Sequence, residues 1–169
     1  MILLDGKQTA ATMRAELKVK IDELKARFGR APGLAVILVG EDPASQVYVR
    51  MKERGCEEAG IKSTAYRLPA DTSQHEVEGL IQDLNRDNGV DGILLQLPLP
   101  KGLDSQHCLE LINPGKDVDG FHPHNVGKMT LGLPGFRPCT PAGSPRSVSA
   151  SAASERSSDD ALASAARSA

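Results

Sequence analysis

The chain has 169 residues, a length that supports one domain with a substantial core and leaves little room for two. Hydrophobic residues make up 40% and charged residues 25%, as in a typical globular protein. A net charge of −2 without a Lys/Arg cluster argues against binding to nucleic acid or to a membrane surface, and no apolar run is as long as a membrane span. Residues 1–5 have neither a basic start nor a long apolar core, so we expect no signal peptide and a cytoplasmic location.

The spacing of cysteine and histidine argues against a disulfide framework and against a metal site. The three cysteines are far apart and form no Cys-x-x-Cys pair: Cys56, Cys108 and Cys139. His122 and His124 are close in sequence, but no third ligand accompanies them at a recognisable spacing. We therefore expect neither a disulfide nor a bound metal.

Hydrophobic periodicity predicts strands that alternate with helices. In chain order we expect a short strand at 2–4, a helix at 7–28, a strand at 34–39, a helix at 43–59, a strand at 61–68, a helix from Ser73 to Asn88, a strand at 90–97 and a helix at 105–112. Such alternation implies a mostly parallel sheet with right-handed crossovers. The predicted fold class is α/β, with three layers and helices on both faces of the sheet.

Several helices carry specific signals. An apolar residue recurs every three or four positions in the first helix: Met13, Leu17, Ile21, Leu24 and Phe28. Ser73 and Glu76 form a capping-box pattern ahead of a core stripe, which consists of Val77, Leu80, Ile81 and Leu84.

The segment 40–52 contains the first candidate site. Asp42 can cap a helix whose first position is Pro43, directly after a buried strand and Gly40. One face of this helix then carries Ser45, Tyr48 and Lys52. We expect a neighbouring apolar stripe to pack on the sheet: Ala44, Val47 and Met51. Open α/β sheets bind ligands at the carboxyl ends of their strands, so the polar face is a candidate site. The alternative is a solvated lysine beside a half-buried tyrosine.

A glutamine follows the third main strand. An unpaired buried amide costs about 1–3 kcal/mol, so Gln96 needs hydrogen-bond partners. Lys52 is one candidate, because its helix starts at the same edge of the sheet; a loop carbonyl is the alternative. The prolines that follow stiffen the chain, and we expect Leu97 and Leu99 to form apolar walls of a pocket.

Two aspartates lie in the polar loop 116–123. Asp117 and Asp119 are two positions apart and point the same way if the loop is extended. One of them could then accept two hydrogen bonds from a planar, amidine-like N–H/NH₂ edge. The alternative is a turn held by hydrogen bonds from the aspartate side chains to the backbone.

Four segments, Gly40–Lys52, Gln96–Pro100, Lys116–Phe121 and Pro138–Gly143, together resemble the bifunctional methylenetetrahydrofolate dehydrogenase/methenyltetrahydrofolate cyclohydrolase family. They occur in the family's order and spacing, and the resemblance covers residues 1–143. It implies a folate-binding catalytic domain in one-carbon metabolism. An unrelated α/β binding domain would require four coincidences.

The resemblance also implies roles for single residues. Tyr48 would stack on the pterin-derived ring of the substrate, and Lys52 would be the general acid/base that assists hydrolysis of the methenyl bridge to the 10-formyl product. Gln96 would orient Lys52, and Asp119 would accept hydrogen bonds from the 2-amino and N3 edge of the pterin. Three further residues are implied as supporting or substrate contacts: Ser45, Leu97 and Pro98.

The family also has a second domain that binds NADP and usually forms homodimers. After Gly143 the composition changes to mostly Ser and Ala, without any glycine, so the NADP motif is missing and we expect a disordered tail. The expected organisation is a catalytic domain at 1–143 and this tail at 144–169. A shifted reading frame would explain the change; a natural short form is the alternative.

The two family activities depend differently on this change. Hydride transfer needs a bound nicotinamide, so we expect no efficient dehydrogenase activity. Hydrolysis needs only Lys52 and water, and we expect weak residual activity at best. The alternative function is a truncated folate-binding or partner-binding fragment without catalysis.

Overall fold

A small parallel sheet lies at the centre of the structure, a computed structural model that describes residues 6–138. The strand order is β2-β1-β3, and every described pair is parallel. In register, Val36 of the central strand pairs with Ala65 on one side and with Leu94 on the other. The strands span Gly33–Val39 (β1), Lys62–Leu68 (β2) and Gly92–Leu95 (β3).

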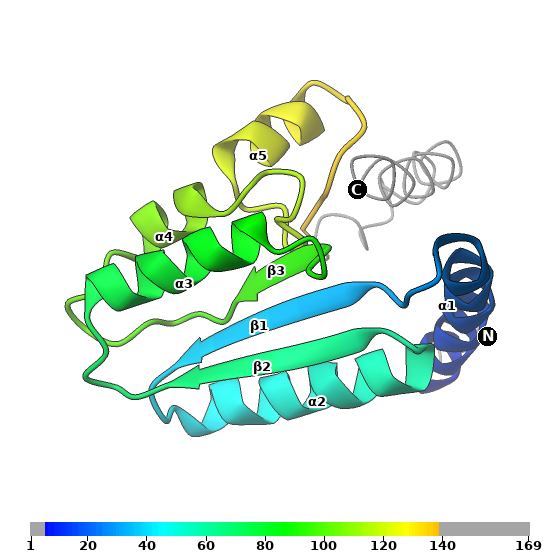
Figure 1. Cartoon of the computed structure of the whole chain (residues 1–169), viewed down its shortest axis with the longest axis horizontal. Helices are drawn as coiled ribbons and strands as arrows, with labels where there is room; N and C mark the ends of the chain where they lie inside the picture. Colours follow the sequence, from blue (N-terminus) through cyan, green and yellow to red (C-terminus); the bar gives the residue numbers. More distant parts are fainter. Residues whose placement is uncertain (1–5, 139–169) are drawn as a thin grey trace, which may run out of the picture.

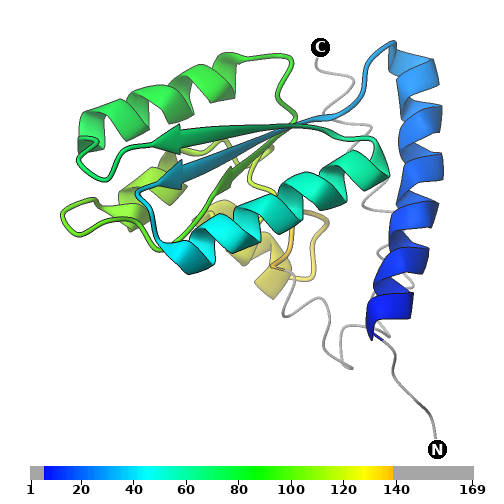
Figure 2. The same ribbon diagram turned by 90° about the horizontal axis from the view of Figure 1, so that it is seen from below.

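Helices cover both faces of this sheet. They span Gly6–Phe28 (α1), Pro43–Ala59 (α2), Gln74–Arg86 (α3), Ser105–Leu111 (α4) and Pro123–Thr130 (α5). Helices α3 and α4 pack on the face that carries Ile37, whereas α2 packs on the face that carries Val36. Figure 1 shows this arrangement, and the turned view in Figure 2 places α3 on one side of the strands and α2 on the other. The predicted three-layer α/β class is therefore confirmed.

Hydrogen bonds confirm both predicted ends of α2 and the predicted start of α3, whereas α3 ends at Arg86, two residues before the expected Asn88. The Asp42 carboxylate accepts from the backbone N–H of Ser45 at 2.7 Å and caps α2. Gly60 ends the same helix at φ 85°, in the left-handed region that favours glycine. At the start of α3, Ser73 and Glu76 form the reciprocal bonds of the capping box.

The expected sheet-facing stripe of α2 is wrong. Val47 and Met51 are 46% and 66% exposed, and Ala44 is exposed too. The buried positions of α2 are instead Ser45, Val49, Cys56 and Ala59. The sheet face that contacts α2 carries large side chains, among them Leu38 and Leu94, which fill the space between the helix and the sheet. The helix therefore packs on it through mostly small residues. Lys52 lies on this inward face, between Val49 and Cys56.

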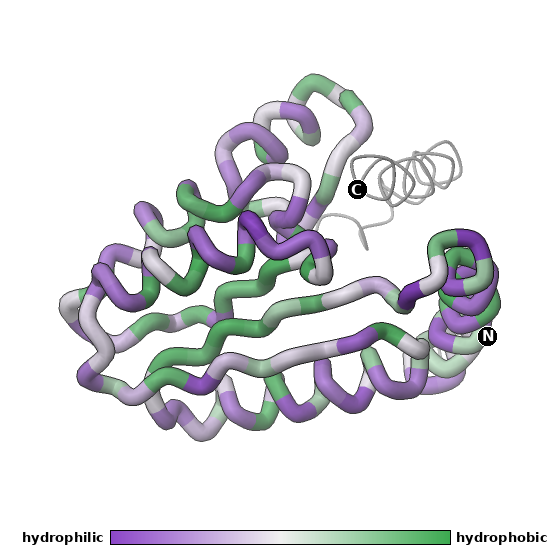
Figure 3. Tube along the Cα trace, in the orientation of Figure 1, coloured by the Kyte–Doolittle hydropathy of each residue, from purple (hydrophilic) through white to green (hydrophobic). Residues whose placement is uncertain are grey.

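Helix α1 has the predicted length but buries little of its apolar stripe. Ile21 is its one buried residue, whereas Met13 and Leu17 are exposed. The reason is the position of α1, which stands beside the amino ends of the strands and contacts α2 (Figure 2). The hydropathy colouring of Figure 3 shows that α1 mixes hydrophilic and hydrophobic residues, whereas strands β1 and β3 are mostly hydrophobic. None of the helices in residues 6–138 is long and apolar enough to cross a membrane.

The structure differs from the prediction at β3 and α5, and one predicted strand falls outside the described residues. Strand β3 ends at Leu95, earlier than expected, and the chain then continues through a cis Leu97–Pro98 bond. Helix α5 is absent from the prediction because eight residues are too short to show a clear apolar period. The strand expected at 2–4 lies outside the described residues.

The core makes one prediction about stability. Ile81 is fully buried between α3 and the sheet, so Ile81→Ala should lower the free energy of unfolding by about 2–5 kcal/mol. Urea unfolding followed by circular dichroism measures the loss. Val19→Ala on the exposed side of α1 is the matched control and should change the value by less than about 0.5 kcal/mol. Equal effects of the two changes would contradict the assigned core.

Candidate functional site

Three segments contribute to one cluster of polar side chains. Helix α2 provides Lys52, the end of β3 provides Gln96, and the loop after α4 provides Asp119. Strands β1 and β3 are parallel, so the residues after them leave the sheet at the same edge. This is the edge where open α/β sheets bind ligands.

Gln96 joins two of these segments. Its Oε1 accepts from Lys52 Nζ at 3.2 Å, and its Nε2 donates to the carbonyl of Leu97 at 2.7 Å. Its backbone N–H also donates to the Ile37 carbonyl in β1 at 2.8 Å. Both partners considered for the Gln96 side chain are therefore present together. Since an ammonium only donates and a carbonyl only accepts, these two contacts determine the orientation of the amide.

Asp117 and Asp119 have different surroundings. Asp117 is 2% exposed, and its Oδ2 accepts from the backbone N–H of His122 at 2.8 Å and from Asn125 Nδ2 at 2.9 Å. The turn interpretation therefore holds for Asp117. No hydrogen bond within residues 6–138 occupies the Asp119 carboxylate, which leaves its oxygens available to a ligand.

Burial raises the pKa of the Asp119 carboxyl above its ordinary value. The charge of Lys52 opposes this shift, and the charge of Asp117 adds to it. Lys52 and Asp119 therefore interact electrostatically across the cluster. Carboxyl groups with a shifted pKa are frequent at functional sites.

The remaining predicted site residues surround this cluster less closely. Tyr48 is 58% exposed and lies one turn before Lys52, so it is accessible to a planar ligand. Ser45 is buried, and its hydrogen bonds to Asp42 lower the pKa of that carboxyl. Leu97 packs partly against the core on the α3 side, and Pro98 is exposed.

Sequence reasoning missed two residues that support the loop. Asn125, in α5, is 2% exposed and bonds to Asp117. Lys116 donates to the carbonyls of Leu84 and Asp87 at the end of α3, at 2.9 and 2.8 Å. Burial lowers the pKa of this lysine. The only available signal was the polar composition of the segment, which does not reveal such long-range contacts.

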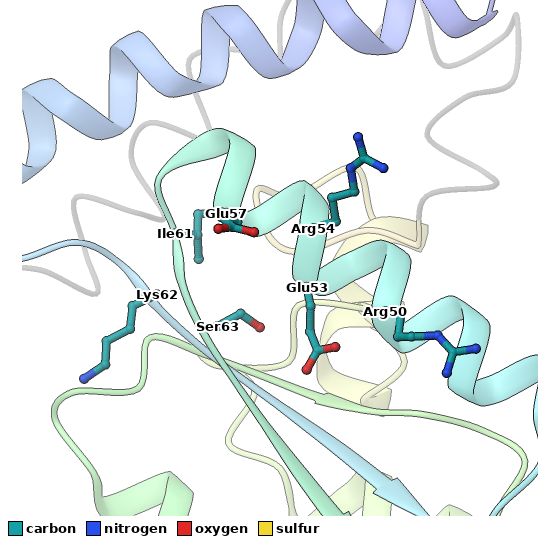
Figure 4. Close-up of a pocket in the computed structure, with 7 residues that line it drawn as sticks. All are labelled: Arg50, Glu53, Arg54, Glu57, Ile61, Lys62 and Ser63. Atoms are coloured by element: carbon teal, nitrogen blue, oxygen red, sulfur yellow. The ribbon is translucent and has the colours of Figure 1, made fainter.

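A separate groove lies between the second half of α2 and the start of β2, and Figure 4 shows its lining. Its walls are Arg50, Glu53, Arg54, Glu57, Ile61, Lys62 and Ser63. None of the predicted site residues lines it, and its charges are of both signs. We therefore place the candidate site at the cluster of Lys52, Gln96 and Asp119, called the Lys52 cluster below, and not in this groove.

The described residues offer no metal site or disulfide. Within residues 6–138 no group of three or more His, Cys, Asp and Glu side chains is arranged to hold a metal ion. Cys56 and Cys108 are free and buried, and burial raises the pKa of both thiols. Cys139 lies outside the described part of the chain.

Comparison with known proteins assigns the chain to a family. The model of the tetrahydrofolate dehydrogenase/cyclohydrolase catalytic domain matches residues 4–119. The chain belongs to this family. "Bifunctional protein FolD" of Maridesulfovibrio salexigens is 75% identical over 143 residues, which are 85% of this chain and 50% of the relative. The protein of the same name from Nitratidesulfovibrio vulgaris strain Miyazaki F is 73% identical over the same shares.

Solved structures of the family agree with this fold. The bifunctional FolD enzyme of Campylobacter jejuni superimposes with a TM-score of 0.83 at 52% identity, over 89% of this chain and 53% of that one. The Trypanosoma brucei enzyme, complexed with NADP cofactor and an inhibitor, gives 0.73 at 35% identity, over 76% and 43%. The chain spans about half the length of the curated relatives that it matches.

The described residues do not fit the phosphates of NADP. Dinucleotide phosphates bind at an open helix N-terminus after a glycine-rich turn. In α2 the Asp42 carboxylate already occupies the first amides, and Glu41 adds a second negative charge beside it. The helix starts of α3, α4 and α5 are capped by Ser73, Asp104 and His122. Helices α2, α3, α4 and α5 therefore offer these phosphates no open N-terminus.

The raised pKa of Asp119 predicts a pH-dependent effect on stability. A carboxyl whose pKa is higher in the folded state contributes stability below its unfolded pKa of about 3.9 and loses it as the pH rises through the folded pKa. Asp119→Asn should therefore increase the free energy of unfolding near pH 7, and the gain should shrink towards pH 3. Urea unfolding at both pH values measures it, with exposed Asp71→Asn as the control. A lower stability of Asp119→Asn at pH 7 would contradict the assignment.

Proposed function

We propose that this chain binds a reduced folate at the Lys52 cluster and that Lys52 is the acid/base for hydrolysis of the methenyl bridge. The observation that carries the proposal is the hydrogen bond between Lys52 Nζ and Gln96 Oε1, with the Asp119 carboxylate in electrostatic contact with the same amine. Family membership supplies the substrate class, because the matching model is named for tetrahydrofolate dehydrogenase/cyclohydrolase.

Recognition of the substrate uses two contacts of different kinds. Asp119 accepts hydrogen bonds from the 2-amino and N3 edge of the pterin, since its oxygens have no partner within residues 6–138. The exposed ring of Tyr48 stacks on the flat ring system of the substrate. Ser45 contributes indirectly, by fixing the start of the helix that carries both Tyr48 and Lys52. Leu97 and Pro98 follow Gln96 and provide apolar contacts at the same edge.

Hydrolysis then needs only proton transfers and water. Water attacks the bridging carbon of the cationic methenyl bridge, and the bond between that carbon and N5 breaks. Both protons leave the attacking oxygen, one reaching N5 and the other released to solvent, which gives the neutral 10-formyl product. Lys52 moves these protons, taking one from the attacking water and delivering one to N5 as it departs. Gln96 keeps the amine in place, because its own amide is fixed by the Leu97 carbonyl and by β1.

Other family properties remain predictions from the resemblance. These are the use of NADP by the intact protein, assembly into homodimers, a cytoplasmic location, and the division of the chain at Gly143. The solved structure of the Trypanosoma brucei relative contains NADP cofactor. Residues 139–169 lie outside the described part of the chain, so the shifted-frame hypothesis stays a prediction that the source DNA across codons 138–149 would test.

Lys52→Met tests the proposed function. The variant cannot transfer protons, so any turnover of methenyltetrahydrofolate by this chain should fall to the spontaneous rate, a loss of at most about 10²–10⁴-fold, while folate binding should persist. The decrease in absorbance of the methenyl compound measures turnover, and fluorescence titration measures binding.

Lys62→Met is the matched control, since it removes the same charge from an exposed position at the other end of the sheet. It should leave turnover unchanged. Equal turnover by Lys52→Met and the wild type would exclude Lys52 as the acid/base. Folate binding by the wild type without any turnover would favour the alternative of a non-enzymatic folate-binding fragment.

A further inference from the structure

The loop 116–120 that carries Asp119 is held firmly at its first residue. Lys116 Nζ donates to two carbonyls at the end of α3, those of Leu84 and Asp87. The Lys116 carbonyl accepts from the backbone N–H of Ile93 in β3 at 2.7 Å. The beginning of the loop is therefore attached to both a helix and the sheet.

Asn125 connects this loop to α5 through two hydrogen bonds. Its Nδ2 donates to Asp117 Oδ2 at 2.9 Å and to the Pro114 carbonyl at 2.9 Å. Asn125 and Asp117 are each 2% exposed, so neither bond competes with water. A short side chain with two donors on one nitrogen is needed here: serine has one donor, and aspartate has none when ionised.

The end of the loop is restricted by close packing. Gly120 has a φ of 67°, and a Cβ at this position would lie 3.0 Å from the backbone of Arg137. Its N–H donates to the Asp117 carbonyl at 3.2 Å. Asp119 thus lies between two residues, Asp117 and Gly120, whose positions are fixed, and its own side chain has no hydrogen bond within residues 6–138 that could hold it.

We propose that Asn125 is a positioning residue for the folate site: through Asp117 it holds the loop so that the Asp119 carboxylate faces the donor edge of the pterin. The inference rests on the proposed function, because it takes Asp119 as the acceptor for that edge. Asn125 itself does not contact the substrate. Its contribution is to the direction of another side chain, and therefore to recognition of the pterin and not to the hydrolytic step.

A double-mutant cycle on the full 169-residue chain tests this proposal. The probes are 5-formyltetrahydrofolate, which is stable in solution, and its 2-desamino analogue, which lacks one of the two donors to Asp119. Asn125→Ala should weaken binding of 5-formyltetrahydrofolate by about tenfold, the effect of losing one hydrogen bond to a charged group. The preference over the desamino analogue should disappear. In an Asp119→Asn background the same change should have no further effect.

Asn85→Ala is the matched control. Asn85 also makes two hydrogen bonds, to the Leu111 carbonyl and from the Asn113 N–H, but it does not contact Asp117. This variant should lower the thermal stability and leave the preference between the two probes intact. Affinities are compared at a temperature where every variant is folded, and Asn125→Ser, which keeps one donor, replaces Asn125→Ala if that variant does not fold.

The outcomes separate the inference from the function on which it rests. If Asn125→Ala weakens both probes by the same factor, or if its effect persists in the Asp119→Asn background, Asn125 is not a positioning residue. If Asp119→Asn leaves the affinity for both probes unchanged, the proposed role of Asp119 is wrong and the inference about Asn125 falls with it.

Discussion

The hydrogen bond between Lys52 and Gln96 determines the geometry on which the rest of the site depends. It joins the inward face of α2 to the chain that leaves β3, two segments that are 44 positions apart in sequence. Gln96 is itself restrained by the Ile37 carbonyl of β1 and by the Leu97 carbonyl. The amine of a long, flexible side chain is thereby held relative to the sheet, at the edge where the candidate ligand contacts meet.

The negative charge of Asp119 lies where the fold would be more stable without it. Lys52 occupies a helix face whose neighbours Val49 and Cys56 are buried, and Asp119 is buried enough for its pKa to rise. Asp117 places a further negative charge close to Asp119, although its own carboxylate is satisfied by His122 and Asn125. The attraction between Lys52 and Asp119 offsets part of the cost of burial. Such conflicts between stability and charge are expected where a protein binds a polar ligand.

Local signals in the sequence predict much of the fold, whereas they do not predict how distant elements pack against one another. Both ends of α2 and the start of α3 follow from Asp42, Gly60 and the capping box of Ser73, because each depends on residues within one turn. The inward face of α2 was assigned wrongly, since the sequence favours the large apolar side chains and the sheet accommodates the small ones. The periodicity of residues 45, 49, 52, 56 and 59 becomes visible only once Lys52 is accepted as partly inward-facing.

The candidate site likewise contains some contacts that the sequence predicts and others that it does not. Lys52 is one of the two partners that the sequence suggests for Gln96, because both residues lie at the carboxyl edge of a parallel sheet, and the structure contains this contact. The different surroundings of Asp117 and Asp119 were not predictable, because the partner of Asp117 is a side chain in a helix that gives almost no sequence signal. Asn125 was missed for the same reason.

The caps on the helices explain why the polar groups of this site lie along a helix face. An open α2 N-terminus would attract anions, but Asp42 satisfies its first amides and the adjacent Glu41 repels negative groups. A ligand at this edge must therefore be recognised by side chains that begin one turn further on, at Tyr48 and Lys52. A carboxylate such as Asp119 then selects for a donor edge and not for a phosphate. Under the proposed function, helix capping, which stabilises the fold locally, thus also disfavours a phosphate and favours a ligand with hydrogen-bond donors at this edge of the sheet.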